Sequence, residues 1–251
     1  MKSIHALSVT AAALALLSIS TPVHAAKSTD ARIESAAKQS HVFKTYLKGD
    51  DIKVKSKDGV VTLTGVVLDD SHLALAQETV AGLPGVKSVD NRLAVKAEPS
   101  TKAPDAWLTA KVKSTLLYHR SVSAKTEVDV KDGVVTLRGA AASQAQKELT
   151  AEYAKDVEGV KDVINEMVVV AAAKPAKTVG KKIDDASITA QVKMVLLYHR
   201  STSALHTKIE TDHGVVSLYG KAKDAAEKNL AAKLAGDVNG VKGVNNRMTV
   251  Q

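Results

Sequence analysis

The sequence predicts an α+β protein made of three tandem small αββαβ modules, each a three-stranded mixed sheet with two helices on one face. The first observation is internal repetition: a block Gly-Val-Val-x-Leu-x-Gly occurs three times, and a block Gly-Val-Lys-x-Val-x-Asn follows it by the same 26 residues in each copy. The two blocks begin at Gly59 and Gly85, at Gly133 and Gly159, and at Gly214 and Gly240. The second observation is composition: 45% of the residues are hydrophobic but only 3% are aromatic, which favours several small cores over one large core.

Each copy opens with a segment of helical periodicity. Asp30, Asp105 and Asp185 precede these segments and are predicted N-caps. In the second copy Leu108 and Val112 begin the apolar stripe that should face the sheet.

A β-hairpin is predicted after each first helix, because glycine in the turn tolerates the positive φ that a tight turn needs. The turns are expected at Asp58-Gly59, Asp132-Gly133 and His213-Gly214. Along the second strand, alternation points Leu137 toward the core and Thr136 away from it, and it points Tyr219 of the third copy outward as well.

A second helix and a third strand complete each copy. The helices should begin near Asp69, Ser143 and Asp224, all good N-caps. Their predicted apolar stripes are Leu75, Thr79 and Leu83; Leu149, Tyr153 and Val157; and Leu230, Leu234 and Val238. The last strands should bury Val89, Leu93 and Val95; Val163, Met167 and Val169; and Val244, Met248 and Val250. A module of this size is marginally stable alone, so we expect the modules to pack against one another.

The modules should span residues 28–97, 104–171 and 183–251, joined by linkers at 98–103 and 172–182. Residues 1–25 are predicted to be a signal peptide, with an uncharged Leu/Ala-rich stretch and cleavage after Ala25. The periplasm is then the expected location, and an uncleaved membrane anchor is the alternative. With no cysteine in the chain, disulfides, thiolate metal sites and a lipidated cysteine are excluded.

The two glycine blocks and the αββαβ order resemble the BON domain family, and the resemblance covers nearly all of residues 28–251. The resemblance implies attachment to phospholipid surfaces, maintenance of the cell envelope under osmotic stress, and periplasmic chaperone activity. The expected partners are therefore an anionic phospholipid surface or proteins of the periplasm and outer membrane.

Charge is unevenly distributed along the chain. The whole sequence carries a net charge of +8, and residues 174–251 hold 13 basic against 7 acidic residues. A basic surface gains roughly 1 kcal/mol per Lys or Arg near an anionic membrane. The candidate residues for binding an anionic surface are Lys181, Lys182, Arg200, Lys221, Lys223, Lys228 and Lys233. The alternative interpretation is a solvated face with no binding role.

Motifs of catalysis are absent from the sequence, and we predict a protein that is not an enzyme and has no cofactor and no metal site. The acidic pairs Asp69-Asp70 and Asp184-Asp185 are explained by helix capping. Nucleic-acid binding is not expected, since the basic residues lack interleaved aromatic side chains.

A structural role in turns and strand ends is predicted for the repeated glycines Gly59, Gly65, Gly85, Gly133, Gly139, Gly159, Gly214, Gly220 and Gly240.

Two further features of the second and third copies are interpreted as structural. The shared sequence Tyr-His-Arg, at His119 and His199, closes each first helix, where a cation is favourable; the alternative is a surface that grips phosphate or a partner. Trp107 is expected to pack against other residues, and the alternative is that it inserts into a membrane.

Two rival functions remain open: a holdase-type chaperone, which would use apolar grooves, and, more weakly supported, peptidoglycan or small-ion binding. The sequence does not predict an oligomeric state.

Overall fold

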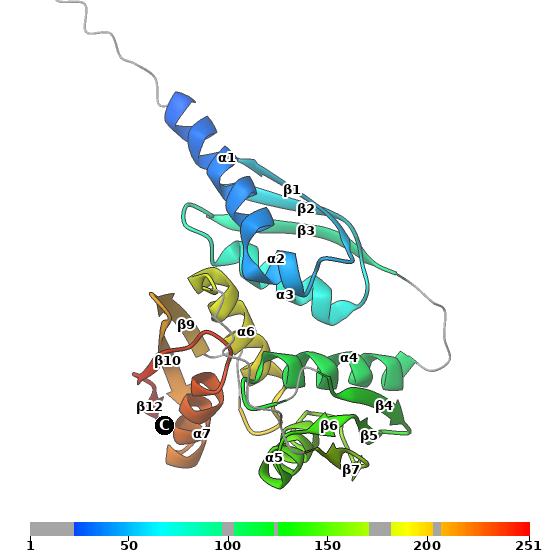
Figure 1. The fold of residues 1–251 in the computed structure, drawn as a ribbon. Helices are drawn as coiled ribbons and strands as arrows, with labels where there is room; N and C mark the ends of the chain where they lie inside the picture. The colour runs from blue at the N-terminus through cyan, green and yellow to red at the C-terminus, as the bar shows by residue number, and fades with distance from the viewer. Residues whose placement is uncertain (1–22, 97–102, 123–124, 171–181, 203–206) are drawn as a thin grey trace, which may run out of the picture.

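The computed structural model describes residues 23–96, 103–122, 125–170, 182–202 and 207–251 (Figure 1). It confirms the α+β class: within these residues each repeat has a small mixed sheet with helices on one face. Lys181 and residues 1–22 of the predicted signal peptide lie outside the described residues.

The first repeat shows the topology in its simplest form. Its elements are α1 (Val23–Gln39), α2 (His41–Thr45), β1 (Asp51–Lys57), β2 (Val60–Val67), α3 (Asp70–Ala81) and β3 (Ser88–Val95). Strand β2 is central: it pairs antiparallel with β1 through the hairpin and parallel with β3 through the crossover helix α3.

The other two repeats follow the same plan with interrupted strands. The second contains α4 (Ala103–Tyr118), β4 (Glu127–Lys131), β5 (Val134–Arg138), β6 (Ala140–Ala141), α5 (Gln144–Lys155), β7 (Asp162–Asn165) and β8 (Val168–Val169). The third contains α6 (Asp185–Tyr198), β9 (Thr207–Asp212), β10 (Val215–Ala222), α7 (Ala225–Gly236), β11 (Gly243–Asn246) and β12 (Thr249–Val250). The pairings repeat those of the first sheet: antiparallel in the hairpins, parallel after the crossovers.

The three hairpin turns share one geometry, which explains the aspartates of the first helices. At each turn the residue before glycine has a positive φ, 54° at Asp132, and the glycine follows with φ 83° at Gly133. Two turn N–H groups, those of Asp132 and Gly133, donate to the Asp105 carboxylate at 2.8 and 3.0 Å. The equivalent carboxylates of Asp30 and Asp185 accept from the turns of their own repeats.

The N-cap assignment of these three aspartates was therefore wrong. Helices α1 and α4 begin before Asp30 and Asp105, and the N-cap of α6 is Asp184, whose side chain accepts from the Ser187 N–H. Each of these carboxylates lies within its helix and reaches the hairpin instead, where two adjacent N–H groups have no ladder partner.

The second helices begin where the sequence predicts. Asp69, Ser143 and Asp224 are extended N-caps, and each side-chain oxygen accepts from the N–H three residues on. The asparagine that ends the second glycine block ties the third strand to this helix: Asn165 donates to the Lys147 carbonyl and accepts from the Met167 N–H.

Core positions follow the predicted alternation in the central strands, where Leu63, Leu137 and Leu218 are all fully buried. All nine repeated glycines have positive φ; at Gly65 an added Cβ would lie 1.9 Å from the Asp51 carbonyl oxygen.

Three predicted core positions are wrong. Leu149 is exposed because Thr150 and Ala154 are the α5 residues that face the sheet. Val169 and Val250 are exposed because they lie at the ends of the last strands.

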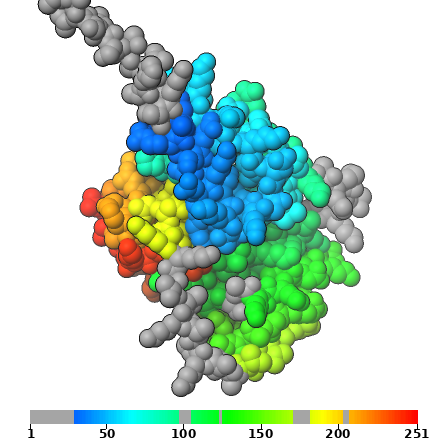
Figure 2. Space-filling model, turned by 45° about the horizontal axis from the view of Figure 1, so that its top comes forward, coloured from blue at the N-terminus to red at the C-terminus, as the bar shows by residue number. Residues whose placement is uncertain are grey.

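The three repeats pack together around α6 (Figures 1 and 2). Most of this helix is buried, on nearly every side, against α3 of the first repeat, α4 of the second and α7 of its own. Polar contacts join α6 to the first repeat: Lys193 pairs with Glu78 at 2.6 Å, and Tyr46 donates to Gln191. Packing between modules therefore occurs through their helices.

Candidate functional site

The predicted basic residues of the third repeat do not form one patch. Lys182 is exposed just before α6, while Lys228 and Lys233 lie on α7, in the helical layer. Lys221 and Lys223 lie at the end of β10, on either side of the buried Ala222. The structure therefore separates the helix lysines from those at the end of the sheet.

Arg200 has a structural position instead. Its guanidinium donates to the carbonyls of Val157 and Val160 at 3.4 and 3.0 Å, and also to the Lys155 carbonyl. These carbonyls lie at or just after the C-terminal end of α5 of the second repeat, so Arg200 joins the third repeat to the second. Its Nη2 group is thus engaged within the chain, while the residue itself is exposed, so Arg200 has a contact between repeats besides its predicted place at the surface.

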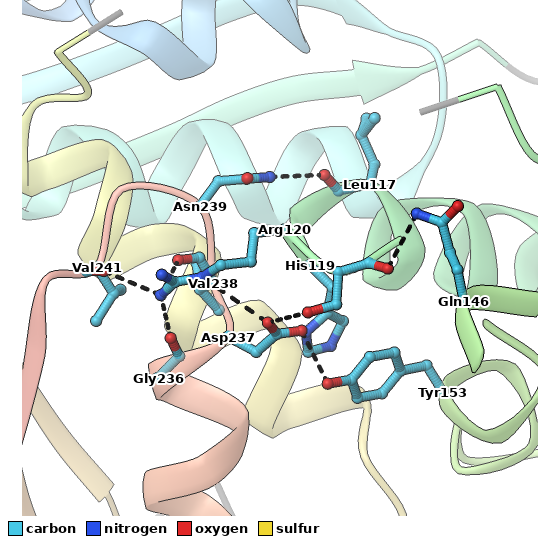
Figure 3. Close-up of polar contacts among 11 residues, drawn as sticks. Leu117, His119, Arg120, Gln146, Tyr153, Gly236, Asp237, Val238, Asn239 and Val241 are labelled. Carbon is cyan, nitrogen blue, oxygen red and sulfur yellow. Dashed lines mark hydrogen bonds and ion pairs between the residues drawn. The ribbon is translucent and has the colours of Figure 1, made fainter. Parts of the chain in front are cut away.

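Arg120 makes the reciprocal contact from the second repeat to the third (Figure 3). Its guanidinium donates to the carbonyls of Gly236, Val238 and Val241 at the C-terminal end of α7. Isolated antiparallel bridges join His119 to Val238 and Val157 to His199. The Tyr-His-Arg segment of each repeat thus contacts the end of the second helix of the other repeat. The two sets of contacts are reciprocal, and we call them the exchange between the second and third repeats.

Asp237 is the centre of this interface (Figure 3). Its carboxylate accepts from Ser121 Oγ at 2.5 Å and from Tyr153 Oη at 2.8 Å, and His119 Nδ1 lies 3.1 Å away. The imidazole of His119 stacks on the Tyr153 ring with 3.8 Å between centroids. One side of the exchange is therefore a buried polar network.

The electrostatics of the network favour a charged Asp237. Burial alone would raise the pKa of Asp237, but hydrogen bonds from His119, Ser121 and Tyr153 outweigh it and hold the pKa below its usual value. Burial, with the negative charge of Asp237, raises the pKa of Tyr153 far above its usual range. Burial lowers the pKa of His199, the charge of Asp156 opposes that shift, and the charge of Arg200 adds to it.

This geometry answers the question that the sequence left open about Tyr-His-Arg. The arginines do sit at helix C-termini, as predicted, but at those of the neighbouring repeat rather than of their own helix. The motif is an interface between repeats.

Trp107 is partly exposed, at 43%, and its ring lies 4.0 Å from Lys111 Nζ. Lys111 itself is buried and pairs with Glu158 at 3.5 Å. Burial lowers the pKa of Lys111, and the charge of Glu158 opposes that shift. The Trp107 ring thus covers a buried ammonium group.

The open face of the third sheet holds cations that the sequence analysis missed. Lys208 of β9 and Arg247, which directly follows β11, lie on either side of Tyr219 of β10, and both cations approach the tyrosine ring. The alternation that already placed Tyr219 outward would have found them had it been applied to the neighbouring strands.

Among the described residues, no group of three or more His, Asp or Glu side chains is arranged to hold a metal ion. Within the same part of the chain, no helix has the length and apolar character needed to cross a bilayer.

Comparison with known proteins gives one family. The BON domain matches residues 29–97, 104–171 and 184–251. Osmotically-inducible protein Y of Escherichia coli is 39% identical over 144 residues, covering 57% of this chain and 70% of that protein. Outer membrane lipoprotein DolP of Haemophilus influenzae is 28% identical over 171 residues, covering 67% of this chain and 86% of that protein.

Proposed function

Because the chain belongs to the BON domain family through all three of its repeats, we propose that it is a non-enzymatic protein of the bacterial cell envelope that binds phospholipid surfaces. We place it in the periplasm after signal-peptide cleavage near Ala25, with a protective role in osmotic stress. The names of its relatives, an osmotically inducible protein and an outer membrane lipoprotein, support the envelope setting.

One observation carries the choice of an anionic surface as partner: the third repeat presents cations on an exposed face. Lys221 and Lys223 are exposed at the end of β10, and Arg247 is exposed between β11 and β12. Cations on one side of a molecule gain from every anionic headgroup within about a Debye length, roughly 10 Å at 0.1 M salt.

Liposome co-sedimentation of the whole chain tests the proposal. Binding should rise with the fraction of phosphatidylglycerol in phosphatidylcholine vesicles and fall steeply with added salt. The whole chain is needed, because an isolated third repeat would expose the apolar surface of α6 that the other repeats cover. Absence of binding at low salt, or binding indifferent to salt, would contradict the proposal.

A holdase-type chaperone is the second candidate, favoured by an apolar row in the second repeat. Ile164, Val168 and Val170 are 48%, 62% and 48% exposed along the last strand. The corresponding positions in the third repeat are the polar Asn245, Thr249 and Gln251. An exposed apolar row of this kind offers a contact for unfolded chains.

Suppression of aggregation of a denatured client tests this second candidate. Val168→Lys should weaken the suppression, and added salt should not. Equal activity of the variant and the wild type would exclude the row as the client site.

A further inference from the structure

The open face of the third sheet carries one tyrosine flanked by two cations. Tyr219 lies opposite Lys208 in the β9–β10 register, with the Lys208 ammonium 5.8 Å from the ring centre. On the other side the Arg247 guanidinium lies 5.7 Å from the same ring. Val216 and Leu218 of the same strand are fully buried beneath the helices, so by alternation Tyr219 faces away from them.

Lys221 extends this group along β10. It lies two residues beyond Tyr219, on the same face, and pairs in register with Thr249 of β12. We call the group formed by Lys208, Tyr219, Lys221 and Arg247 the Arg247 face.

In the other two repeats the arginine of the same cross-strand row is paired with a carboxylate. In the first repeat it reads Lys53, Thr64 and Arg92, and Arg92 pairs with Asp90 at 2.6 Å. In the second repeat Arg138 pairs with Glu166 at 2.8 Å. Each arginine on these two sheet faces thus has its own carboxylate.

The third repeat lacks that carboxylate. Asn245 occupies the position of Asp90, and among the described residues no carboxylate lies within 4.0 Å of the Arg247 guanidinium or the Lys221 ammonium. Glu210 is nearby, but its carboxylate forms an ion pair with the Lys208 ammonium at 2.7 Å. The hydrogen bond and charge of Lys208 dominate the lowering of the Glu210 pKa, with Arg247 a smaller contributor. Arg247 and Lys221 are therefore exposed cations without a direct ion pair among the described residues, beside a tyrosine and the Lys208–Glu210 pair.

We propose that the Arg247 face is the site at which the chain grips the phosphate of an anionic lipid headgroup at a bilayer surface. The guanidinium of Arg247 offers paired donors that match phosphate oxygens, and Lys221 adds a second positive charge. Tyr219 suits the same setting, since its ring is apolar and its hydroxyl is polar, as in tyrosines at membrane interfaces. This assignment rests on the phospholipid-binding function proposed above and locates it on the sheet rather than on α7.

The test compares two arginine variants of the whole chain, Arg247→Gln and Arg92→Gln. Both remove one positive charge from the same row of a sheet face, and both side chains are exposed, so net charge and foldedness are matched. We expect Arg247→Gln to weaken binding to phosphatidylglycerol-containing vesicles about five-fold, as the loss of one surface-bound cation implies, and Arg92→Gln less than about two-fold. Soluble glycerol 3-phosphate, added as a competitor, should leave the vesicle-bound fraction unchanged.

The outcomes separate the two proposals. Equal losses in the two variants would overturn the site while leaving phospholipid binding intact, since net charge alone would then explain the affinity. Complete displacement by glycerol 3-phosphate would overturn the assignment to a bilayer surface and make the free phosphate ester the ligand. A wild-type chain that does not bind the vesicles would overturn the site together with the proposed function.

Discussion

Replacing Asp237 by alanine should cost far more stability than replacing Asp156, its counterpart in the exchange between the second and third repeats. The Asp237 side chain is 17% exposed, and it accepts from Ser121 and Tyr153 with His119 at 3.1 Å. The Asp156 side chain is 45% exposed, and its contact with His199 is 3.7 Å long. The asymmetry arises because Tyr153 of α5 donates to Asp237, whereas Leu234 occupies the equivalent position of α7.

The magnitude follows from the groups left behind. Asp237→Ala removes the acceptor of a partly buried tyrosine hydroxyl and of a buried imidazole, and one lost partner in such a charged network costs about 3 kcal/mol. For a chain of this size that corresponds to a fall in Tm of about 6–12 °C. Asp156→Ala removes a long, half-exposed contact and should cost less than about 1 kcal/mol.

Urea denaturation of both variants, with thermal melts in parallel, measures the difference. If the two alanine variants unfolded at the same midpoint, the buried network would not hold the second and third repeats together. An Asp237→Ala variant as stable as the wild type would refute the reasoning outright.

Four other outcomes are expected. Leu137→Ala, at a fully buried position, should destabilise the chain by about 2–5 kcal/mol in urea, whereas Thr136→Ala on the opposite face should cost under about 1 kcal/mol; equal midpoints would refute the face assignment. Asp105→Ala should cost about 1–2 kcal/mol in the same assay because two turn N–H groups lose their acceptor, and an unchanged midpoint would contradict this. Because the pKa of His199 is lowered in the folded state, the unfolded chain takes up its proton first, so stability should fall as the pH drops from about 7 to 5; a His199→Gln variant should show a shallower fall. Mass spectrometry of exported protein should find Ala26 as the first residue, and an intact amino terminus in a membrane fraction would contradict cleavage.

Local chemistry was predictable from the sequence wherever a residue acts on its own neighbours. The N-caps Asp69, Ser143 and Asp224 were identified because a cap bonds an N–H three residues away. The buried Leu63 and Leu137 were identified because alternation along a strand fixes the two faces of a sheet. Repetition strengthened each of these predictions, since the same pattern had to make sense three times.

The contacts that the sequence did not reveal act over longer distances. Asp105 was taken for a cap because aspartate at a helix start usually is one, yet its carboxylate reaches a hairpin 27 residues away. The contacts of Arg200 were missed because nothing in its local sequence reveals the carbonyls of another repeat. That Arg247 has no ion pair could not be predicted from the sequence, because the residues that lie beside it across the sheet are known only from the strand register.

The sequence by itself determined that there are three αββαβ units, where their turns and cores lie, and that positive charge gathers in the last unit. Only the tertiary structure decided which of those charges face solvent and which hold the units together. The physical reason is that periodicity and capping are set by neighbours along the chain, whereas the partner of a charge is set by whichever surface packs against it. Tyr-His-Arg reads identically in two repeats, yet only the docked arrangement shows that each copy completes the other's second helix and leaves Arg247 exposed on the open sheet.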